Sequence, residues 1–190
     1  MIEVEIEPSK ELAYLLGVAQ ADGYLKRFIW KGRERVGLDF GVAEKSLPML
    51  EKFRNLSDSV FDRKTSMWKD KKSVWRYHLS VKSLLQQFRD LQIIVSPVYL
   101  APVWAVKEKS YFGAYLAGLI DGDGDVRIKR PEYPQCVIRI TSGLVQDFLQ
   151  KQLEALLTVK VSQTRMSGKR VIKGKIVDSK WVSLEFYVSK

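Results

Sequence analysis

Apolar positions recur along the chain with two different spacings, and these spacings predict the order of helices and strands. Alternating apolar and polar residues are typical of strands, whereas apolar residues three or four positions apart are typical of helices. In the first half of the chain, strands are predicted at 24–32, 35–43, 64–70 and 73–82, and helices at 47–56 and 83–91. In the second half, strands are predicted at 126–130, 135–142, 159–166 and 181–190, and a helix at 144–157.

An internal repeat divides the chain into two halves. The stretch "AYLLGVAQADGYL" (13–25) aligns without gaps with "AYLAGLIDGDGDV" (114–126), at a constant offset of 101 residues. Each stretch contains a predicted helix that ends in an aspartate, Asp22 or Asp123. With the strands and helices that follow, each half has the predicted order α-β-β-α-β-β, and the first half adds a terminal helix. We expect the repeats to comprise residues 1–95 and 111–190, with the terminal helix of the second repeat missing. A linker at 96–110, which contains two prolines, would join them.

The strand patterns predict an α+β fold with two antiparallel sheets. In the stretch "VRIKR", Val126 and Ile128 alternate with Arg127 and Lys129, so one face is apolar and the other is basic. Helices are expected to cover the apolar face of each sheet and to leave the basic face free. The pattern is weaker in 24–32, where neither side of the strand is clearly apolar.

Small residues recur every fourth position in both repeated helices. The two strips are Ala13, Gly17 and Ala21 in the first half, and Ala114, Gly118 and Gly122 in the second. Small residues at this spacing allow two helix backbones to approach closely. The two helices are therefore expected to pack against each other along these strips, about a pseudo-two-fold axis.

This packing would bring Asp22 and Asp123, at the ends of the two helices, near one another. Two carboxylates at helix C-termini repel each other and also face the negative ends of both helix dipoles. A cation would relieve this repulsion, and oxygen ligands without histidine or cysteine point to a hard divalent ion, Mg²⁺ first. Gly23 and Gly124 are expected to end the two helices.

Two other interpretations of the acidic stretch after residue 120 remain open. Asp121, Asp123, Asp125 and Glu132 match four positions of a calcium-binding EF-hand loop, but Val126 stands where that loop requires glycine. The alternative is an acidic turn on the protein surface that has no ligand.

The overall charge indicates a polyanionic partner. The chain of 190 residues has a net charge of +10 and a sequence pI near 9.6, and nucleic acid is the usual partner of such a protein. The single cysteine, Cys136, excludes a disulfide framework. The N-terminus is acidic and unlike a signal peptide, and the longest apolar run is too short to span a bilayer. We therefore expect an intracellular, soluble protein.

The residues "YLAGLIDGDG" and "YLLGVAQADG" closely resemble the signature of the LAGLIDADG homing endonucleases. The arrangement is similar to that of the single-chain, two-repeat members of the family. The resemblance implies a monomer that binds a long, asymmetric site in double-stranded DNA without a protein partner, in a saddle of two sheets with helices on the convex side. It implies Mg²⁺-dependent cleavage of both strands with short 3′ overhangs, in an archaeon or an organelle. Mn²⁺ or Ca²⁺ would also fit the metal site.

The resemblance also implies roles for particular residues. Asp22 and Asp123 would bind the metals, joined by the backbone carbonyls of Ala21 and Gly122. The attacking water would be positioned by a polar or basic residue at the end of the second strand of each half, and the matching places are Glu44 and Lys45, and Thr141 and Ser142. Lys45 is the catalytic residue predicted among these, and Lys107 and Lys109 are further basic candidates. Asp121, which Gln20 replaces in the first half, is predicted to cap or pack the helix end, and Asp125 to begin the strand.

DNA contacts are predicted from the polar strand faces, where arginine can read guanine and lysine can neutralise phosphate. The predicted contact residues of the first half are Lys26, Phe28, Trp30, Arg33, Arg35, Trp68, Arg76 and His78. Those of the second half are Arg127, Lys129, Arg139, Thr141, Arg165, Glu185 and Tyr187. The competing hypothesis is a nucleic-acid-binding relative without nuclease activity, such as a splicing maturase.

Overall fold

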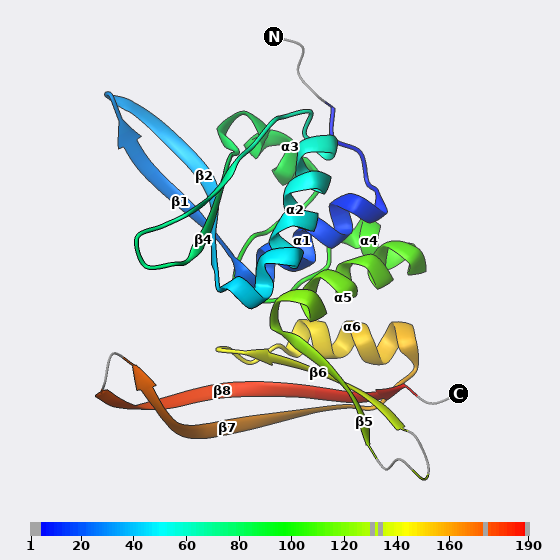
Figure 1. The fold of residues 1–190 in the computed structure, drawn as a ribbon. Helices are drawn as coiled ribbons and strands as arrows, with labels where there is room; N and C mark the ends of the chain where they lie inside the picture. The colour runs from blue at the N-terminus through cyan, green and yellow to red at the C-terminus, as the bar shows by residue number, and fades with distance from the viewer. Residues whose placement is uncertain (1–4, 130–131, 133–134, 173–174, 189–190) are drawn as a thin grey trace. The chain divides into compact units, whose positions relative to one another are not determined.

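The computed structural model describes residues 5–129, 132, 135–172 and 175–188. The chain forms two compact units (Figure 1). The first comprises Met1–Ser96 and Ala101–Gly122, and the second comprises Pro97–Leu100 and Asp123–Lys190. This division differs from the division by repeats, because the helix of the second motif packs on the helix of the first motif.

The first unit contains a four-stranded antiparallel sheet in the order β1-β2-β4-β3. Its strands are β1 (Gly23–Trp30), β2 (Arg33–Val42), β3 (Met67–Lys69) and β4 (Trp75–Ser80). Its helices are α1 (Lys10–Asp22), α2 (Leu47–Val60), α3 (Leu85–Asp90), α4 (Val103–Lys107) and α5 (Lys109–Asp123), whose last residue belongs to the second unit. Short 3₁₀ turns, η1 (Glu44–Ser46) and η2 (Lys82–Leu84), precede α2 and α3.

The second unit repeats this sheet topology, in the order β5-β6-β8-β7. Its elements are β5 (Gly124–Lys129), β6 (Gln135–Ser142), α6 (Asp147–Leu157), β7 (Val161–Ile172) and β8 (Lys175–Val188). The predicted α+β class and the α-β-β-α-β-β order of both halves are therefore confirmed. Arg130, Ser189 and Lys190, which were expected to extend β5 and β8, lie outside the described residues.

The last hairpin is longer than the sequence pattern predicted. β7 was expected to end near Met166 and β8 to begin at Trp181, but the ladder continues to the pair Ile172 and Lys175. The intervening residues are rich in glycine, serine and lysine, which are typical of a loop. Backbone pairing between the two antiparallel strands overrides that local preference.

Aromatic and aliphatic side chains fill the core between the first sheet and its helices. Phe40 and Tyr77 lie on one face of the sheet, and Phe53 of α2 packs on both, with ring centroids 4.5 Å and 5.5 Å away. The Tyr77 hydroxyl lies 2.5 Å from the Ser57 hydroxyl in this core, so the buried polar end has a partner. In the second unit, β8 and α6 bury Leu184, Phe186, Leu149 and Leu153.

One edge strand of each sheet, β1 in the first unit and β5 in the second, carries exposed apolar side chains. Val126 and Ile128 were expected on a covered apolar face, but they are 58% and 71% exposed. That prediction was wrong, because the helix that covers the second sheet contacts β7, at its opposite edge. On β1, Leu25 and Ile29 are exposed as well, in agreement with the weak pattern of that strand.

Among the described residues, no helix is both long enough and apolar enough to cross a membrane.

Candidate metal centre and nucleic-acid interface

The two motif helices meet through backbone contacts at their small residues. A Cβ atom added at Gly17 would lie 2.1 Å from the carbonyl oxygen of Tyr115 and 3.0 Å from Cα of Gly118. One added at Gly118 would lie 2.3 Å from the carbonyl oxygen of Tyr14. Because no side chain fits at either position, the prediction that α1 and α5 pack along these strips is confirmed.

The end of α1 is set by local contacts. The helix begins at the Ser9 cap, whose hydroxyl accepts a bond from the Leu12 amide at 3.1 Å, and ends at Asp22. Gly23 ends the helix as expected, with extended backbone angles (φ −90°, ψ 156°). Glycine is needed there for space, since a Cβ atom would lie 2.7 Å from the carbonyl oxygen of Ala19.

Asp22 is a partly buried carboxylate at the end of α1. Burial raises the pKa of this group above its usual value, because the charged form loses its hydration. Within the described residues, no side-chain hydrogen bond or ion pair satisfies its oxygens. Gly122 packs on Ala21 at this end of the helix pair, and a Cβ at Gly122 would lie 3.4 Å from Asp22 Oδ2. Glycine is needed at 122 because a Cβ there would lie only 2.5 Å from Cβ of Ala21.

The position two residues before each motif aspartate is bonded to the opposite helix. The Tyr14 hydroxyl of α1 donates to Asp121 Oδ2 at 2.7 Å, and the Tyr115 hydroxyl of α5 donates to Gln20 Oε1 at 2.6 Å. Lys52 of α2 lies over the Tyr14 ring and 3.4 Å from the same Asp121 oxygen. These bonds agree with the predicted packing role of Asp121. Gln20 also donates its Nε2 to the carbonyl of Ile94 at 2.7 Å, which a carboxylate could not do.

Replacing Gln20 with methionine should destabilise the fold. Methionine has similar length but cannot make the bonds to Tyr115 and Ile94, so the expected loss is about 1–3 kcal/mol. Denaturant unfolding of the variant would measure it. Gln86→Met, on the exposed face of α3, is the matched control and should change stability by less than about 0.5 kcal/mol. Equal midpoints for both variants would contradict the importance of these bonds.

Asp123 is held from two sides in the second unit. The Tyr99 hydroxyl donates to its Oδ2, and the Thr141 hydroxyl donates to its backbone carbonyl at 3.0 Å. Tyr99 is fixed in turn by the buried Gln146, whose Oε1 accepts from the Tyr99 amide at 2.7 Å and whose Nε2 donates to the carbonyl of Pro97. These bonds attach residues 97–100 to the second unit and set the orientation of the Asp123 carboxylate.

Asp123 opens onto a pocket of about 510 Å³ on the same unit. Its lining residues are Asp123, Arg139, Thr141, Ser142, Gly143, Ser179, Lys180 and Trp181. A carboxylate and two cationic side chains thus share one open cavity. Neither Lys180 nor Tyr99 was predicted as a site residue from the sequence. Lys180 lies in a stretch that reads as a loop, and Tyr99 lies in the apparent linker, so neither position carried a local signal.

None of the lysines predicted to position water lines the pocket of Asp123. Lys45 is exposed on the η1 turn that follows β2, and its catalytic role stays a prediction. Glu44 beside it accepts from Lys69 Nζ at 2.6 Å and Trp75 Nε1 at 3.0 Å, so it ties the turn to the sheet. Lys109 begins α5 while Asp123 ends it, and a helix of this length separates them by about 20 Å. Lys107 precedes that helix, so neither lysine adjoins Asp123.

The residues that surround the motif aspartates fit a hard divalent cation. The predicted donors, the carboxylates of Asp22 and Asp123 and the backbone carbonyls of Ala21 and Gly122, are all oxygen atoms, which such a cation prefers. In the part of the chain that the structure describes, no three acidic, histidine or cysteine residues form a complete metal cage. Mg²⁺ commonly binds through one or two carboxylates and completes its shell with water and substrate phosphates. A site that is finished by DNA therefore fits this arrangement.

The calcium-loop interpretation is wrong. α5 continues through Asp121 to Asp123, and the residues that follow form β5, which contains Asp125, so three of the proposed ligands lie in a helix and a strand instead of a loop. The acidic-turn interpretation fails for the same reason.

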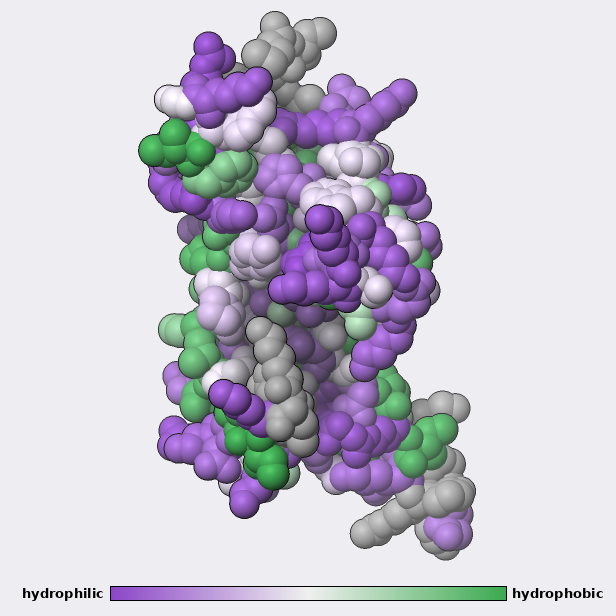
Figure 2. Space-filling view, turned by 60° about the vertical axis from the view of Figure 1, so that its left-hand side comes forward, coloured by the Kyte–Doolittle hydropathy of each residue, from purple (hydrophilic) through white to green (hydrophobic). Residues whose placement is uncertain are grey.

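The outer face of the first sheet carries all the DNA-contact residues predicted for this unit. Strand register places on this face Lys26, Phe28, Trp30, Arg33, Arg35, Trp68, Arg76 and His78. His78 packs over Gly37, where a Cβ would lie 2.1 Å from its ring, and it bonds to Asp39 through Nδ1. It therefore lies among the predicted DNA contacts, not at a motif aspartate. Figure 2 shows that hydrophilic residues predominate on one face of the molecule.

The outer face of the second sheet carries most of its predicted contact residues. Register places on this face Arg127, Lys129, Arg139, Thr141, Glu185 and Tyr187. Arg165 differs, because it pairs with Val182 and so points to the other face, where it lines a cavity with Trp181 and Lys180. The halves also differ at Thr141. Gly124 pairs with Ile140 just as Gly23 pairs with Phe40, so the next residues, Thr141 and Gly41, occupy equivalent positions.

Solved structures with a similar arrangement of helices and sheets include LAGLIDADG homing endonucleases. An I-DmoI variant, in complex with nicked target DNA and in the presence of manganese, is 18% identical and covers 93% of this chain and 88% of its own, with a TM-score of 0.61. An I-SmaMI variant is 14% identical with a TM-score of 0.52, covering 98% of this chain and 80% of its own. The fold is that of the LAGLIDADG endonucleases.

Another LAGLIDADG protein, the meganuclease I-AabMI bound to uncleaved DNA, is 10% identical over 93% of this chain and 78% of its own, with a TM-score of 0.51. No protein-family model and no curated protein matches the sequence. The LAGLIDADG likeness is therefore carried by the fold, in which each motif forms a helix that ends at an aspartate, Asp22 or Asp123.

Proposed function

We propose that the protein is a site-specific, metal-dependent DNA endonuclease. The observation that carries the proposal is the pocket of the second unit, where the motif aspartate Asp123 adjoins the cationic Arg139 and Lys180. An acidic metal ligand beside basic side chains suits a phosphodiester, because the metal and the cations all attract phosphate oxygens. The DNA-bound relatives with the same fold support the choice of substrate.

Each half has one motif aspartate and is assigned one DNA strand. Asp22 and Asp123 would bind Mg²⁺ together with the carbonyls of Ala21 and Gly122. The metal would activate water and stabilise the leaving 3′ oxygen. Tyr99 orients the Asp123 carboxylate, which lines the pocket, through its hydrogen bond to Oδ2.

Lys180 is the basic residue that we assign to the cleavage pocket of the second half. Its ammonium group would attract the phosphate and hydrogen-bond to the attacking water. In the first half this role is proposed for Lys45. The polar outer faces would hold the duplex on either side of the cleavage position, through the contact residues that the strand register places there.

Cleavage of selected DNA tests the proposal. Duplexes that the protein binds are first selected from a randomised library in Ca²⁺, and are then incubated with the protein and Mg²⁺ or Mn²⁺. We expect double-strand breaks at one position, with short 3′ overhangs, and no cleavage in EDTA. Sequencing of the fragment ends measures position and overhang. Tight, sequence-specific binding without cleavage in any divalent cation would instead identify a DNA-binding protein that lacks nuclease activity.

A further inference from the structure

Three arginines on the outer sheet faces share one arrangement. Arg139 donates through Nε to Asp125 Oδ1 at 2.7 Å, Arg127 donates through Nε to Asp125 Oδ2, and Arg76 donates through Nε to Asp70 Oδ2 at 2.9 Å. The contact through Nε leaves the distal edge of each guanidinium, formed by Nη1 and Nη2, for another partner. Within the described residues, no hydrogen bond from these distal nitrogens is found.

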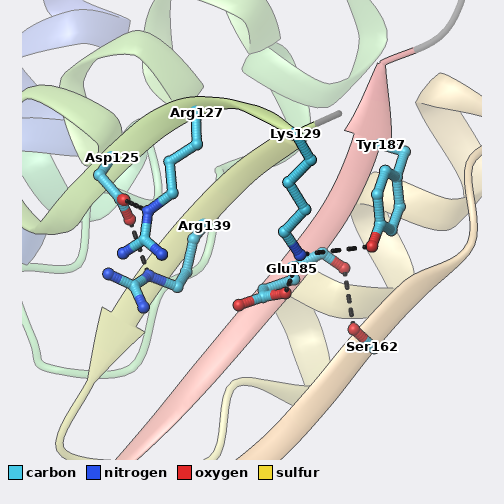
Figure 3. A network of polar contacts seen from close by, with 7 residues as sticks. All are labelled: Asp125, Arg127, Lys129, Arg139, Ser162, Glu185 and Tyr187. Carbon is cyan, nitrogen blue, oxygen red and sulfur yellow. Dashed lines mark hydrogen bonds and ion pairs between the residues drawn. The ribbon is translucent and has the colours of Figure 1, made fainter. Parts of the chain in front are cut away.

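Asp125 lies where it can hold two arginines at once. It is directly opposite Arg139 across β5 and β6, and Arg127 is two residues further along β5 on the same face. Figure 3 shows both guanidinium groups converging on this carboxylate. Each of its two oxygens accepts one guanidinium Nε–H, so a single side chain holds both arginines.

Stability alone does not explain this cluster. The Arg127, Asp125 and Arg139 side chains are 48%, 35% and 31% exposed, and ion pairs at such positions contribute little to folding. An acidic residue on a face that binds DNA also repels phosphates. The remaining effect of the carboxylate is on the two arginines, because it restricts long side chains to one orientation before DNA arrives.

We propose that Asp125 determines sequence specificity by holding Arg127 and Arg139 with their distal edges towards the major groove, so that each reads a guanine. The two distal N–H groups of arginine match O6 and N7 of guanine, which is the commonest specific base contact. Asp70 does the same for Arg76 in the first unit, where a turn fixes the carboxylate through the amides of Lys72 and Val74 at 2.8 Å and 3.1 Å. The inference rests on the proposed binding of DNA by the outer faces.

Selection from a randomised duplex library in Ca²⁺ tests the inference without cleavage. Sites selected by the unchanged protein should contain guanine at two positions that Asp125→Ala no longer specifies, with a loss of roughly 5- to 150-fold in preference at each. Affinity for random duplex DNA should stay the same or rise, because a negative charge has been removed. Glu51→Gln, which removes a charge from the exposed face of α2, is the control and should select the original sites.

Two further variants separate orientation from charge. Arg127→Lys and Arg139→Lys keep the charge but lose the forked edge, so each should lose one of the two guanines that Asp125→Ala loses. Asp70→Ala should lose a different guanine, in the half-site of the first unit, and should keep these two. Thermal unfolding would establish that every variant is folded.

The possible outcomes are distinct. If Asp125→Ala selects the same guanines with unchanged preference, or only binds all DNA more tightly, the carboxylate acts through charge and the inference is wrong. If the unchanged protein selects no sequence, site-specific DNA binding itself fails, and the proposed function fails with it.

Discussion

Replacing Asp123 with asparagine should abolish cleavage of the DNA strand assigned to the second half while leaving binding to a selected site in place. Asparagine has nearly the same shape, so the Tyr99 contact region is preserved, but the loss of charge removes most of the affinity for Mg²⁺. Metal catalysis supplies several kcal/mol of transition-state stabilisation, so the rate should fall at least about a thousandfold. Gel-shift titration in Ca²⁺ and single-turnover cleavage in Mg²⁺ would measure the two properties separately.

Asp22→Asn should have the same effect on the strand assigned to the first half. A nicking assay with each strand labelled would show which strand each variant spares. Asp90→Asn, at the exposed end of α3, is the matched control and should cut at the normal rate. Full cleavage by Asp22→Asn or Asp123→Asn would remove the motif aspartates from the mechanism.

Gly17→Ala should be among the most destabilising single-methyl changes in this chain. The added Cβ would lie 2.1 Å, 2.9 Å and 3.0 Å from backbone atoms of Tyr115, Leu119 and Gly118, none of which can rotate away. Alanine favours a helix over glycine by about 1 kcal/mol, but overpacking of this kind costs about 1–3 kcal/mol or more. Because the whole of α5 must shift, we expect a net loss of about 2 kcal/mol or more in the free energy of unfolding.

The chain contains its own control for this experiment. Gly113 lies on the exposed side of the same α5 helix, and a Cβ added there would have no neighbour within 4 Å. Gly113→Ala should therefore stabilise the protein by about 0.5–1 kcal/mol, which is the propensity effect without the clash. Chemical denaturation of both variants would measure the difference. A neutral Gly17→Ala would show that the two motif helices can separate at little cost.

The repeat made much of the candidate site predictable. Gly17 and Gly118 recur at matching places in the two halves, and their role follows from their size alone, since only a small residue permits backbone contact. Asp22 and Asp123 were identified in the same way. The strand faces were also predictable where basic and apolar residues alternate, as they do around Arg139.

Other features had no local signal. Tyr99 is one aromatic residue in a proline-containing stretch, and its contact with Asp123 depends on Gln146, 47 residues further along the chain. Lys180 lies in a polar stretch that forms a strand only because β7 pairs with it. Val126 and Ile128 alternate as core residues do, but the covering helix lies at the opposite edge of their sheet, and periodicity says nothing about where a sheet extends past its helix.

The sequence by itself determined the order of helices and strands, the α+β class and the aspartates that end the two motif helices. These properties follow from the spacing of neighbouring residues and from the repeat, both of which are written in the chain. Only the tertiary structure decided which hydrogen-bond partners the equivalent positions of the two motifs have. Asp121 bonds to a tyrosine 107 residues away, and Gln20 to one 95 residues away, so each residue's role depends on which helix lies against it.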